Sequence, residues 1–186
     1  MASRGDSRWA VTLVVVLVVA LGAMIGVAGL RLAQLRTVPL AYGRPYPTVG
    51  AGAPKLEVSE DVWTDPSSQA VYDTLSQYFT AINTKDYALW SATVTPARAA
   101  QEAEPQWRNS IRTGTIRLAR IDQVGPGRLI ALVSYASQQD AKDAPPPYTD
   151  KDQQLCWRVA FPMVGSPPRV DVKNPGDTLI GPCFQS

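Results

Sequence analysis

Two cysteines, Cys156 and Cys183, are the residues of this 186-residue chain whose types and spacing most directly indicate chemistry. An even number of cysteines suits a single disulfide formed in an oxidising compartment. The loop that such a bond closes has about 28 residues, and chain entropy predicts a stabilisation of about 3 to 4 kcal/mol for it. The alternative is a pair of buried, inert thiols, and the residues alone leave both possibilities open.

The chain contains no histidine, which removes several common catalytic and metal-binding arrangements. Histidine-dependent general bases, the Ser-His-Asp triad and histidine-containing metal sites all need that side chain. Asp150-Lys151-Asp152 begins like a calcium-binding loop but lacks the glycine and the terminal glutamate of that motif. Gly125-Pro126-Gly127 is spaced as a hairpin turn and opens no phosphate-binding helix. We therefore expect neither a metal ion nor a cofactor.

Three helical segments are expected in the middle of the chain. A capping carboxylate followed by proline at Asp65-Pro66 favours a helix start, and an apolar stripe at spacings of three and four predicts a helix over about 66–83. A short second helix is expected to begin at the capping residue Asp86. A third opens at Thr95-Pro96, and Pro105 should kink or divide it.

After Gly114 the apolar residues alternate with a period of two, which predicts strands. The alternation slips near Ala119 or Arg120, and this slip indicates a β-bulge. The strand after the hairpin turn is apolar on both faces, as expected for a central strand. The clearest alternation runs over residues 155–163, and a last short strand is expected near Val170. Helices followed by a meander of antiparallel strands predict an α+β domain.

An uncharged apolar run of 22 residues, Trp9–Leu30, lies close to the N-terminus. As a helix it spans roughly 33 Å, enough to cross the hydrocarbon core of a bilayer. The alternative is a cleavable signal peptide, whose apolar region is usually about 7 to 15 residues long and ends at a small-residue site. The run is longer and has no clean site of that kind. Gly22 and Gly26 form a small-xxx-small step that permits close helix contact, although glycine is also common in membrane helices without such contact.

The predicted organisation has four parts: a cytosolic N-terminus over residues 1–8, a transmembrane helix with its extension over 9–36, a tether over 37–65 and an extracytoplasmic domain over 66–186. The tether contains four prolines and three glycines without periodicity, which is typical of a semi-extended linker. From Thr37 onward the chain has fourteen basic and fifteen acidic residues, so its charge does not favour nucleic-acid binding. A disulfide would place this domain outside the cytosol.

One motif at the end of the first expected helix resembles a known family. It has the pattern Y-h-x-A-h-N-x-x-D, where h is apolar, and occupies Tyr78 to Asp86. Followed by a short helix with an aromatic residue, it resembles the ketosteroid-isomerase-like superfamily, also called SnoaL-like or nuclear-transport-factor-two-like. Cys156-Trp157-Arg158 is similar to membrane-anchored or secreted versions from actinobacterial envelopes. The resemblance covers about residues 66–172 and implies a cystatin-like cone, with helices packed on a curved antiparallel sheet.

The resemblance to the isomerase branch of that family implies a set of catalytic residues. There the tyrosine matching Tyr78 donates a hydrogen bond to an oxyanion, beside a protonated aspartate and a second carboxylate that acts as base. In this chain residues 93–100 contain no carboxylate, and the late strand presents Trp157 and Phe161 at its inward positions. Asp122 is a substitute base in principle, but a carboxylate at a strand end beside a turn is usually solvated. We therefore expect Tyr78 to form part of the core or of a pocket wall.

These features predict a non-enzymatic, single-pass membrane protein whose external domain binds partner proteins or an apolar ligand. Its partners would be the membrane, through residues 9–30, and other envelope membrane proteins. A role in a transport or secretion assembly is implied by the resemblance alone. The alternative is a small-molecule isomerase, cyclase or carrier that uses the cavity of the cone. In both cases the expected lining residues are aromatic: Tyr78, Trp90, Trp107, Trp157 and Phe161.

Overall fold

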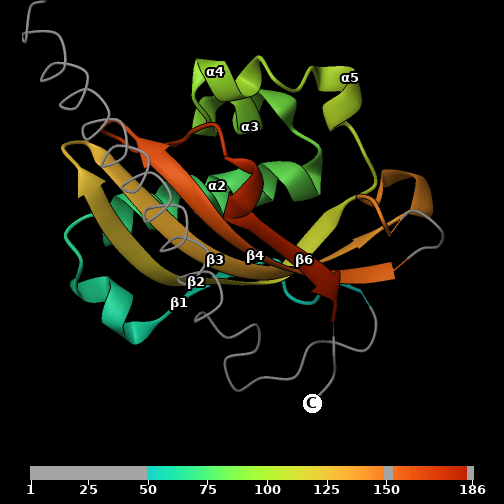
Figure 1. The fold of residues 1–186 in the computed structure, drawn as a ribbon, viewed down its shortest axis with the longest axis horizontal. Coiled ribbons are helices and arrows are strands. Elements are labelled where there is room, and N and C mark those ends of the chain that lie inside the picture. Colours follow the sequence, from blue (N-terminus) through green and yellow to red (C-terminus); the bar gives the residue numbers. More distant parts are fainter. Residues whose placement is uncertain (1–49, 149–152, 184–186) are drawn as a thin grey trace, which may run out of the picture.

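A computed structural model describes residues 50–148 and 153–183 of the chain. This part forms an α+β domain in which helices lie on one side of a curved six-stranded sheet (Figure 1), which confirms the predicted fold class at that level. The predicted membrane run over 9–30, with Gly22 and Gly26, lies outside the described residues. Within the described residues, no helix is both long enough and apolar enough to span a bilayer.

The domain begins before residue 66, which corrects the prediction of a tether over 37–65. Strand β1 (Leu56–Val58) and the 3₁₀ helix η1 (Glu60–Thr64) both lie in that segment, and Leu56 and Val62 are buried in the core. β1 pairs in parallel with β2 (Arg112–Gly125), so the sheet is mixed and not purely antiparallel. The two strands of a parallel pair lie far apart in the sequence, so no hairpin turn indicates that they pair.

The second and third helices begin at their predicted caps, Asp86 and Thr95, whereas the first begins at Ser68, two residues after the predicted start at Pro66. Asp86 caps the second helix through its carboxylate, which accepts a hydrogen bond from the Leu89 amide at 2.9 Å. Pro105 divides the third predicted helix, as expected, because it lies in the first turn of a separate short helix. The four helices are α2 (Ser68–Thr84), α3 (Tyr87–Thr93), α4 (Pro96–Ala99) and α5 (Glu104–Trp107).

Five strands follow β1, in the neighbour order β1-β2-β3-β4-β5, with β6 also paired to β4. The pairing register of β2 with β3 shifts between Leu118 and Arg120, which confirms the predicted bulge. β6 was not predicted, because its five residues show no clear alternation and end on glycine and proline. The remaining strands are β3 (Arg128–Gln139), β4 (Gln153–Val164), β5 (Arg169–Val170) and β6 (Thr178–Pro182).

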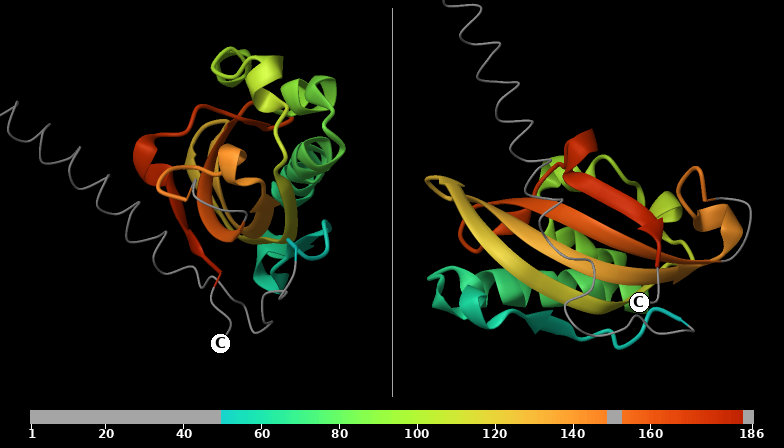
Figure 2. Two further views of the ribbon diagram at one scale, coloured as in Figure 1. Left: turned by 90° about the vertical axis from the view of Figure 1, so that its right-hand side faces the viewer. Right: turned by 60° about the horizontal axis from the view of Figure 1, so that its bottom comes forward.

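The main core lies between α2 and the facing side of the sheet (Figure 2). The alternating residues predicted for β3 and β4 supply the sheet side, and Val71, Leu75 and Phe79 supply the helix side. The second face of β3 is also buried, through Ile130 and Leu132, which confirms that β3 is a central strand. Burial on this scale stabilises the domain by roughly 1.5 to 3 kcal/mol for each large apolar side chain.

The end of α2 is held to the start of β2 by Asn83, a residue of the family-like motif. Its amide group donates to the Thr113 carbonyl at 3.0 Å and accepts from the Thr113 backbone N–H at 2.7 Å. Lys85 ends the helix in the left-handed conformation, with φ of 60°. These contacts fix the position from which α3 departs, so much of the motif has a role in building the fold.

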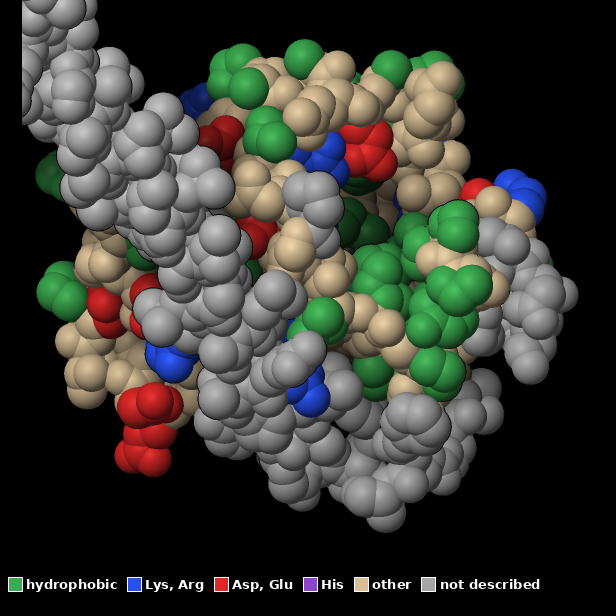
Figure 3. Space-filling model, viewed as in Figure 1, with side chains coloured by type: hydrophobic (Ala, Val, Ile, Leu, Met, Phe, Trp, Pro, Cys, Tyr) green, Lys and Arg blue, Asp and Glu red, His purple; other side chains and the backbone are tan. Residues whose placement is uncertain are grey.

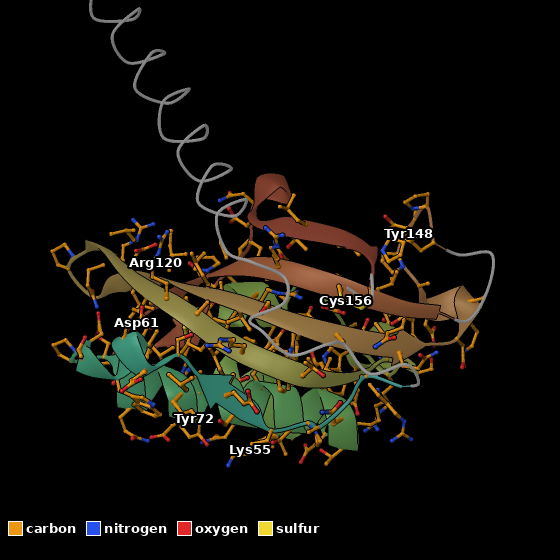
Figure 4. The ribbon with its side chains drawn as sticks, turned by 90° about the horizontal axis from the view of Figure 1, so that it is seen from below. Lys55, Asp61, Tyr72, Arg120, Tyr148 and Cys156 are labelled. Carbon is orange, nitrogen blue, oxygen red and sulfur yellow. A yellow bond between two sulfur atoms is a disulfide. The ribbon has the colours of Figure 1, made fainter. Side chains whose placement is uncertain are left out.

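The cysteines form the predicted disulfide, between Cys156 on β4 and Cys183 just after β6. Their Cα atoms are 5.0 Å apart, which is an ordinary spacing for such a bond. Cys156 is buried against Ala136 on the sheet face that points away from the main core. Figure 4 shows Cys156 on the broad sheet, whereas Lys55 and Tyr72 lie beside β1 and α2.

Candidate functional site

A cavity of about 180 Å³ lies where the helices meet the sheet. Its walls come from α2 to α5 and the segments that follow them, the start of β2, the strands β3 and β4, and the segment after β5. Figure 3 shows a hollow with hydrophobic side chains inside it and acidic and basic side chains at its edge. The lining residues are Tyr78, Ile82, Lys85, Trp90, Arg98, Glu102, Trp107, Asn109, Ile111, Thr113, Tyr135, Trp157 and Lys173.

Four of the five aromatic residues expected at the cavity do line it: Tyr78, Trp90, Trp107 and Trp157. The fifth, Phe161, is buried one layer deeper in the core. Its ring packs edge-on against Tyr78, with a centroid separation of 5.5 Å. Phe161 therefore supports the floor of the cavity and is not among its lining residues.

The aromatic walls form two groups, of which the helix-side pair is tilted and the sheet-side pair is stacked. On the helix side the rings of Trp90 and Trp107 are 5.5 Å apart. On the sheet side Tyr135 and Trp157 stack almost in parallel, at 5.6 Å and an interplanar angle of 8°. The Trp157 indole N–H donates to the Ser137 hydroxyl at 2.7 Å, which holds that ring in place. Aromatic side chains held in this way form walls between which a flat apolar group can bind.

Two tyrosines at the cavity stay protonated at neutral pH. Burial raises the pKa of Tyr78, although the positive charge of Arg98 and a hydrogen bond from Trp90 act in the opposite direction. Burial raises the pKa of Tyr135 well above its ordinary value, and the neighbouring Tyr78 adds to the effect. Both phenols are therefore neutral groups that can donate or accept a hydrogen bond, and neither is a base.

Arg98 and Glu102 form an ion pair at the cavity, with Arg98 Nη2 and Glu102 Oε2 2.7 Å apart. They lie four residues apart, and the Arg98 side chain is only 14% exposed. The Arg98 guanidinium also lies over the ring of Trp90, 5.4 Å from its centroid. Among the described residues, Glu102 is the one carboxylate that lines the cavity. Its charge is therefore neutralised by a neighbour that is itself held in place.

Lys173 brings a second cation to the cavity from the segment after β5. Its ammonium lies 5.5 Å from the centroid of the Phe161 ring. Desolvation is the main cause that lowers the pKa of Lys173, and the positive charge of Arg98 lowers it further, whereas Glu102 and Asp177 raise it. Within the described part of the chain, the ammonium has no hydrogen bond and no ion pair.

A third cation, Lys85, is already engaged. Its ammonium donates to the Ile111 carbonyl. Burial and the nearby charge of Arg112 lower the pKa of Lys85, while Asp143 raises it. The cavity therefore has three cationic side chains and one carboxylate along its walls.

Sequence reasoning missed the charged half of this site. Arg98 and Glu102 have the spacing of a helical ion pair, which was a usable signal. Lys173 had none, because it lies in a segment without periodicity and only the fold brings it to the cavity. Asp122, the substitute base considered above, does not line the cavity and pairs with Arg120 at 3.1 Å. In the described residues, no cluster of acidic or thiol side chains is arranged to hold a metal ion.

No protein-family model, curated protein or solved structure matches this chain. The resemblance to the ketosteroid-isomerase-like superfamily stays a prediction that depends on the motif at Tyr78 to Asp86.

Proposed function

We propose that this protein is a non-catalytic, membrane-anchored binding protein whose external domain holds a small, largely apolar ligand in the aromatic cavity. The observation that supports this proposal is a cavity with two aromatic walls. Among the described residues it has one lining carboxylate, Glu102, which is paired with Arg98. The apolar run over residues 9–30 is the proposed anchor. The disulfide between Cys156 and Cys183 supports a location outside the cytosol, where such bonds persist.

The size of the cavity limits the ligand. Its volume of about 180 Å³ is close to that of an engineered cavity of about 150 Å³ that binds benzene. Sites for drug-sized molecules are larger, at about 300 to 1,000 Å³. The cavity therefore suits one ring-sized group, which is either a whole small molecule or one end of a longer one.

The arrangement of the polar groups favours binding over catalysis. A general base must hold a free lone pair within hydrogen-bonding reach of the proton that it removes. Glu102 is occupied by Arg98, and the two tyrosines are neutral. An enzyme of the isomerase type needs a second carboxylate at the site, and among the described lining residues there is none.

The role in the envelope follows from the proposed anchor. Ala51 is already packed in the domain and the apolar run ends at Leu30, so about twenty residues connect the two, few enough to keep the domain close to the membrane surface. We assign the protein to the accessory subunits of an envelope transport or secretion assembly. The Gly22 and Gly26 step is the proposed contact with another membrane helix.

Mild detergent extraction of the full chain from its native membrane, followed by mass spectrometry of the bound small molecules, tests the binding function. The matched variant is Ile82→Trp, which fills the cavity from the partly buried face of α2. We expect the wild type to retain a ring-containing or short-chain molecule and the variant to lose it. Equal amounts in both samples would show that the molecule binds elsewhere and would overturn the proposal.

The same extraction tests the remaining parts of the proposal. Replacing Gly22 and Gly26 with leucine should reduce co-purification of other membrane proteins, and unchanged co-purification would reject that contact. Tyr78→Phe keeps the cavity wall but removes the phenol, so it should leave ligand retention largely intact. If the wild type converts the retained molecule and Tyr78→Phe abolishes the conversion, the protein is an enzyme and the non-catalytic assignment is wrong.

A further inference from the structure

The charges around the cavity do not balance. Three of its charged side chains are cationic, and the one carboxylate, Glu102, is already paired with Arg98. Lys85 directs its ammonium to the Ile111 carbonyl. The ammonium of Lys173 is the charged group that remains, and in the described part of the chain it has no polar partner.

Lys173 is partly buried at the wall of the cavity, where its ammonium lies over the Phe161 ring. Desolvation removes water from a group that has three N–H donors to satisfy, and a nearby like charge increases the cost. Partial burial and the charge of Arg98 both lower the pKa of Lys173, whereas Glu102 and Asp177 raise it. A methionine or leucine at this position would fill the same space without that cost. The cavity wall carries three cationic side chains and one carboxylate that is already paired with Arg98, and this excess of positive charge favours an anion that binds beside Lys173.

We propose that the ligand carries a single carboxylate, which Lys173 and Arg98 bind at one end of the cavity while the aromatic walls hold its apolar part. This inference rests on the proposed binding function and names its ligand class. Arg98 can contribute because a guanidinium has five N–H donors, and Glu102 accepts from one of them. Each hydrogen bond to the carboxylate is then charge-assisted.

The walls also limit the charge of the ligand. Glu102 lies in the same cavity and repels a second negative charge, so a phosphate dianion fits less well than a carboxylate. The volume of about 180 Å³ has room for one ring and one small charged group. The stacked pair of Tyr135 and Trp157 favours a flat ring. The ligand class is therefore a monocarboxylate attached to a ring-sized apolar group.

Fluorine NMR of two matched probes with the full chain in detergent micelles tests this inference. 4-Fluorobenzoate carries the carboxylate, and 4-fluorobenzyl alcohol has the same ring without the charge; empty micelles provide the blank. We expect the wild type to bind the benzoate at least about tenfold more tightly than the alcohol, since a hydrogen bond to a charged group contributes about 1.5 to 3 kcal/mol. Lys173→Met should remove this difference, and Lys173→Arg should preserve it.

Control variants separate this role from a structural one. Lys142 is exposed, does not line the cavity and carries the same charge, so Lys142→Met should leave both affinities unchanged. Intrinsic tryptophan fluorescence and an intact disulfide report whether each variant is folded. If Lys173→Met does not fold, Lys173→Gln provides a second neutral side chain for the same comparison.

The outcomes distinguish this inference from the proposed function. If the two probes bind the wild type equally, or if neutral variants at Lys173 bind the benzoate as the wild type does, the carboxylate assignment is overturned while the apolar cavity stands. If neither probe binds at millimolar concentration, the cavity does not take ring-sized ligands, and both proposals are rejected. Loss of benzoate binding alone in Lys173→Met supports both.

Discussion

Breaking the disulfide should destabilise the domain chiefly at its last strand. The two cysteines are 27 residues apart, so the bond closes a loop of about 28 residues. The chain-entropy relation gives about 12 cal/mol/K for that loop, which is about 3.6 kcal/mol at 25 °C. Domains of this size are commonly stable by about 5 to 15 kcal/mol. Reduction should therefore remove a large fraction of the total stability without unfolding every molecule.

The position of the disulfide predicts which strand loses the most stability when the bond is reduced. β6 is only half-buried, and it is held by its pairing with β4 and by the disulfide that follows it. The partners of β4 on its other side, in β3, are buried on both faces and do not depend on the bond. After reduction β6 should therefore open locally and lose more of its amide protection than β3, which exchanges only when the whole domain unfolds.

Urea unfolding of the oxidised and the reduced full chain in mild detergent, followed by tryptophan fluorescence, measures the total loss. Hydrogen exchange with mass spectrometry locates it. The double variant Cys156→Ala with Cys183→Ala should behave like the reduced wild type, since it lacks the bond without any reductant. A loss below about 1 kcal/mol, or amide protection in β6 that stays equal to that in β3 after reduction, would refute the reasoning.

Three further predictions concern the fold and the site. Gly114→Ala places a Cβ 2.3 Å from the Gly52 carbonyl oxygen, so we expect a loss of about 1 to 3 kcal/mol in urea unfolding, whereas Gly125→Ala meets open space and should change stability by less than about 0.5 kcal/mol. Equal effects would contradict the packing of residues 51–53 against β2. Asn83→Ala removes both hydrogen bonds to Thr113 and should cost about 1 to 3 kcal/mol by the same measurement. Lys173→Met should raise the midpoint of thermal unfolding at pH 7, because the folded domain holds this lysine with a pKa below the ordinary 10.5. Between the pKa of Lys173 in the folded domain and 10.5, the unfolded chain binds more protons than the folded one. The wild type therefore gains stability as pH rises through this interval, and the difference between Lys173→Met and the wild type shrinks. A difference that grows with pH would contradict the lowered pKa of Lys173.

Local patterns in the sequence predicted much of the fold. The capping carboxylate of Asp86, the division of a helix at Pro105 and the bulge near Ala119 depend on residues within a few positions of one another. The alternation in β4 also predicted which residues face the core. Such signals are visible in a sequence because caps, proline and strand periodicity act over short distances along the chain.

The strand in the supposed tether and the charged side of the cavity were not predictable in this way. Val58 of β1 pairs with Leu118, and the two segments carry no shared pattern. Lys173 approaches Arg98 and Glu102 only because β5 returns the chain to the helices. Neither Lys173 nor β1 lies in a segment with a periodic pattern of apolar residues, so no local signal indicated their positions.

By itself, the sequence determined the α+β class, the alternation of the core strands, the pair of cysteines available for a disulfide and an aromatic set that converges on one cavity. Only the tertiary structure decided that residues 51–64 belong to the domain, that Phe161 lies beneath the cavity and that Lys173 lines the same cavity as the ion pair of Arg98 and Glu102. The physical reason is the range of the interactions. Periodicity and capping act between near neighbours, whereas parallel pairing and the charge balance of a cavity are set by residues that meet only after the chain has folded.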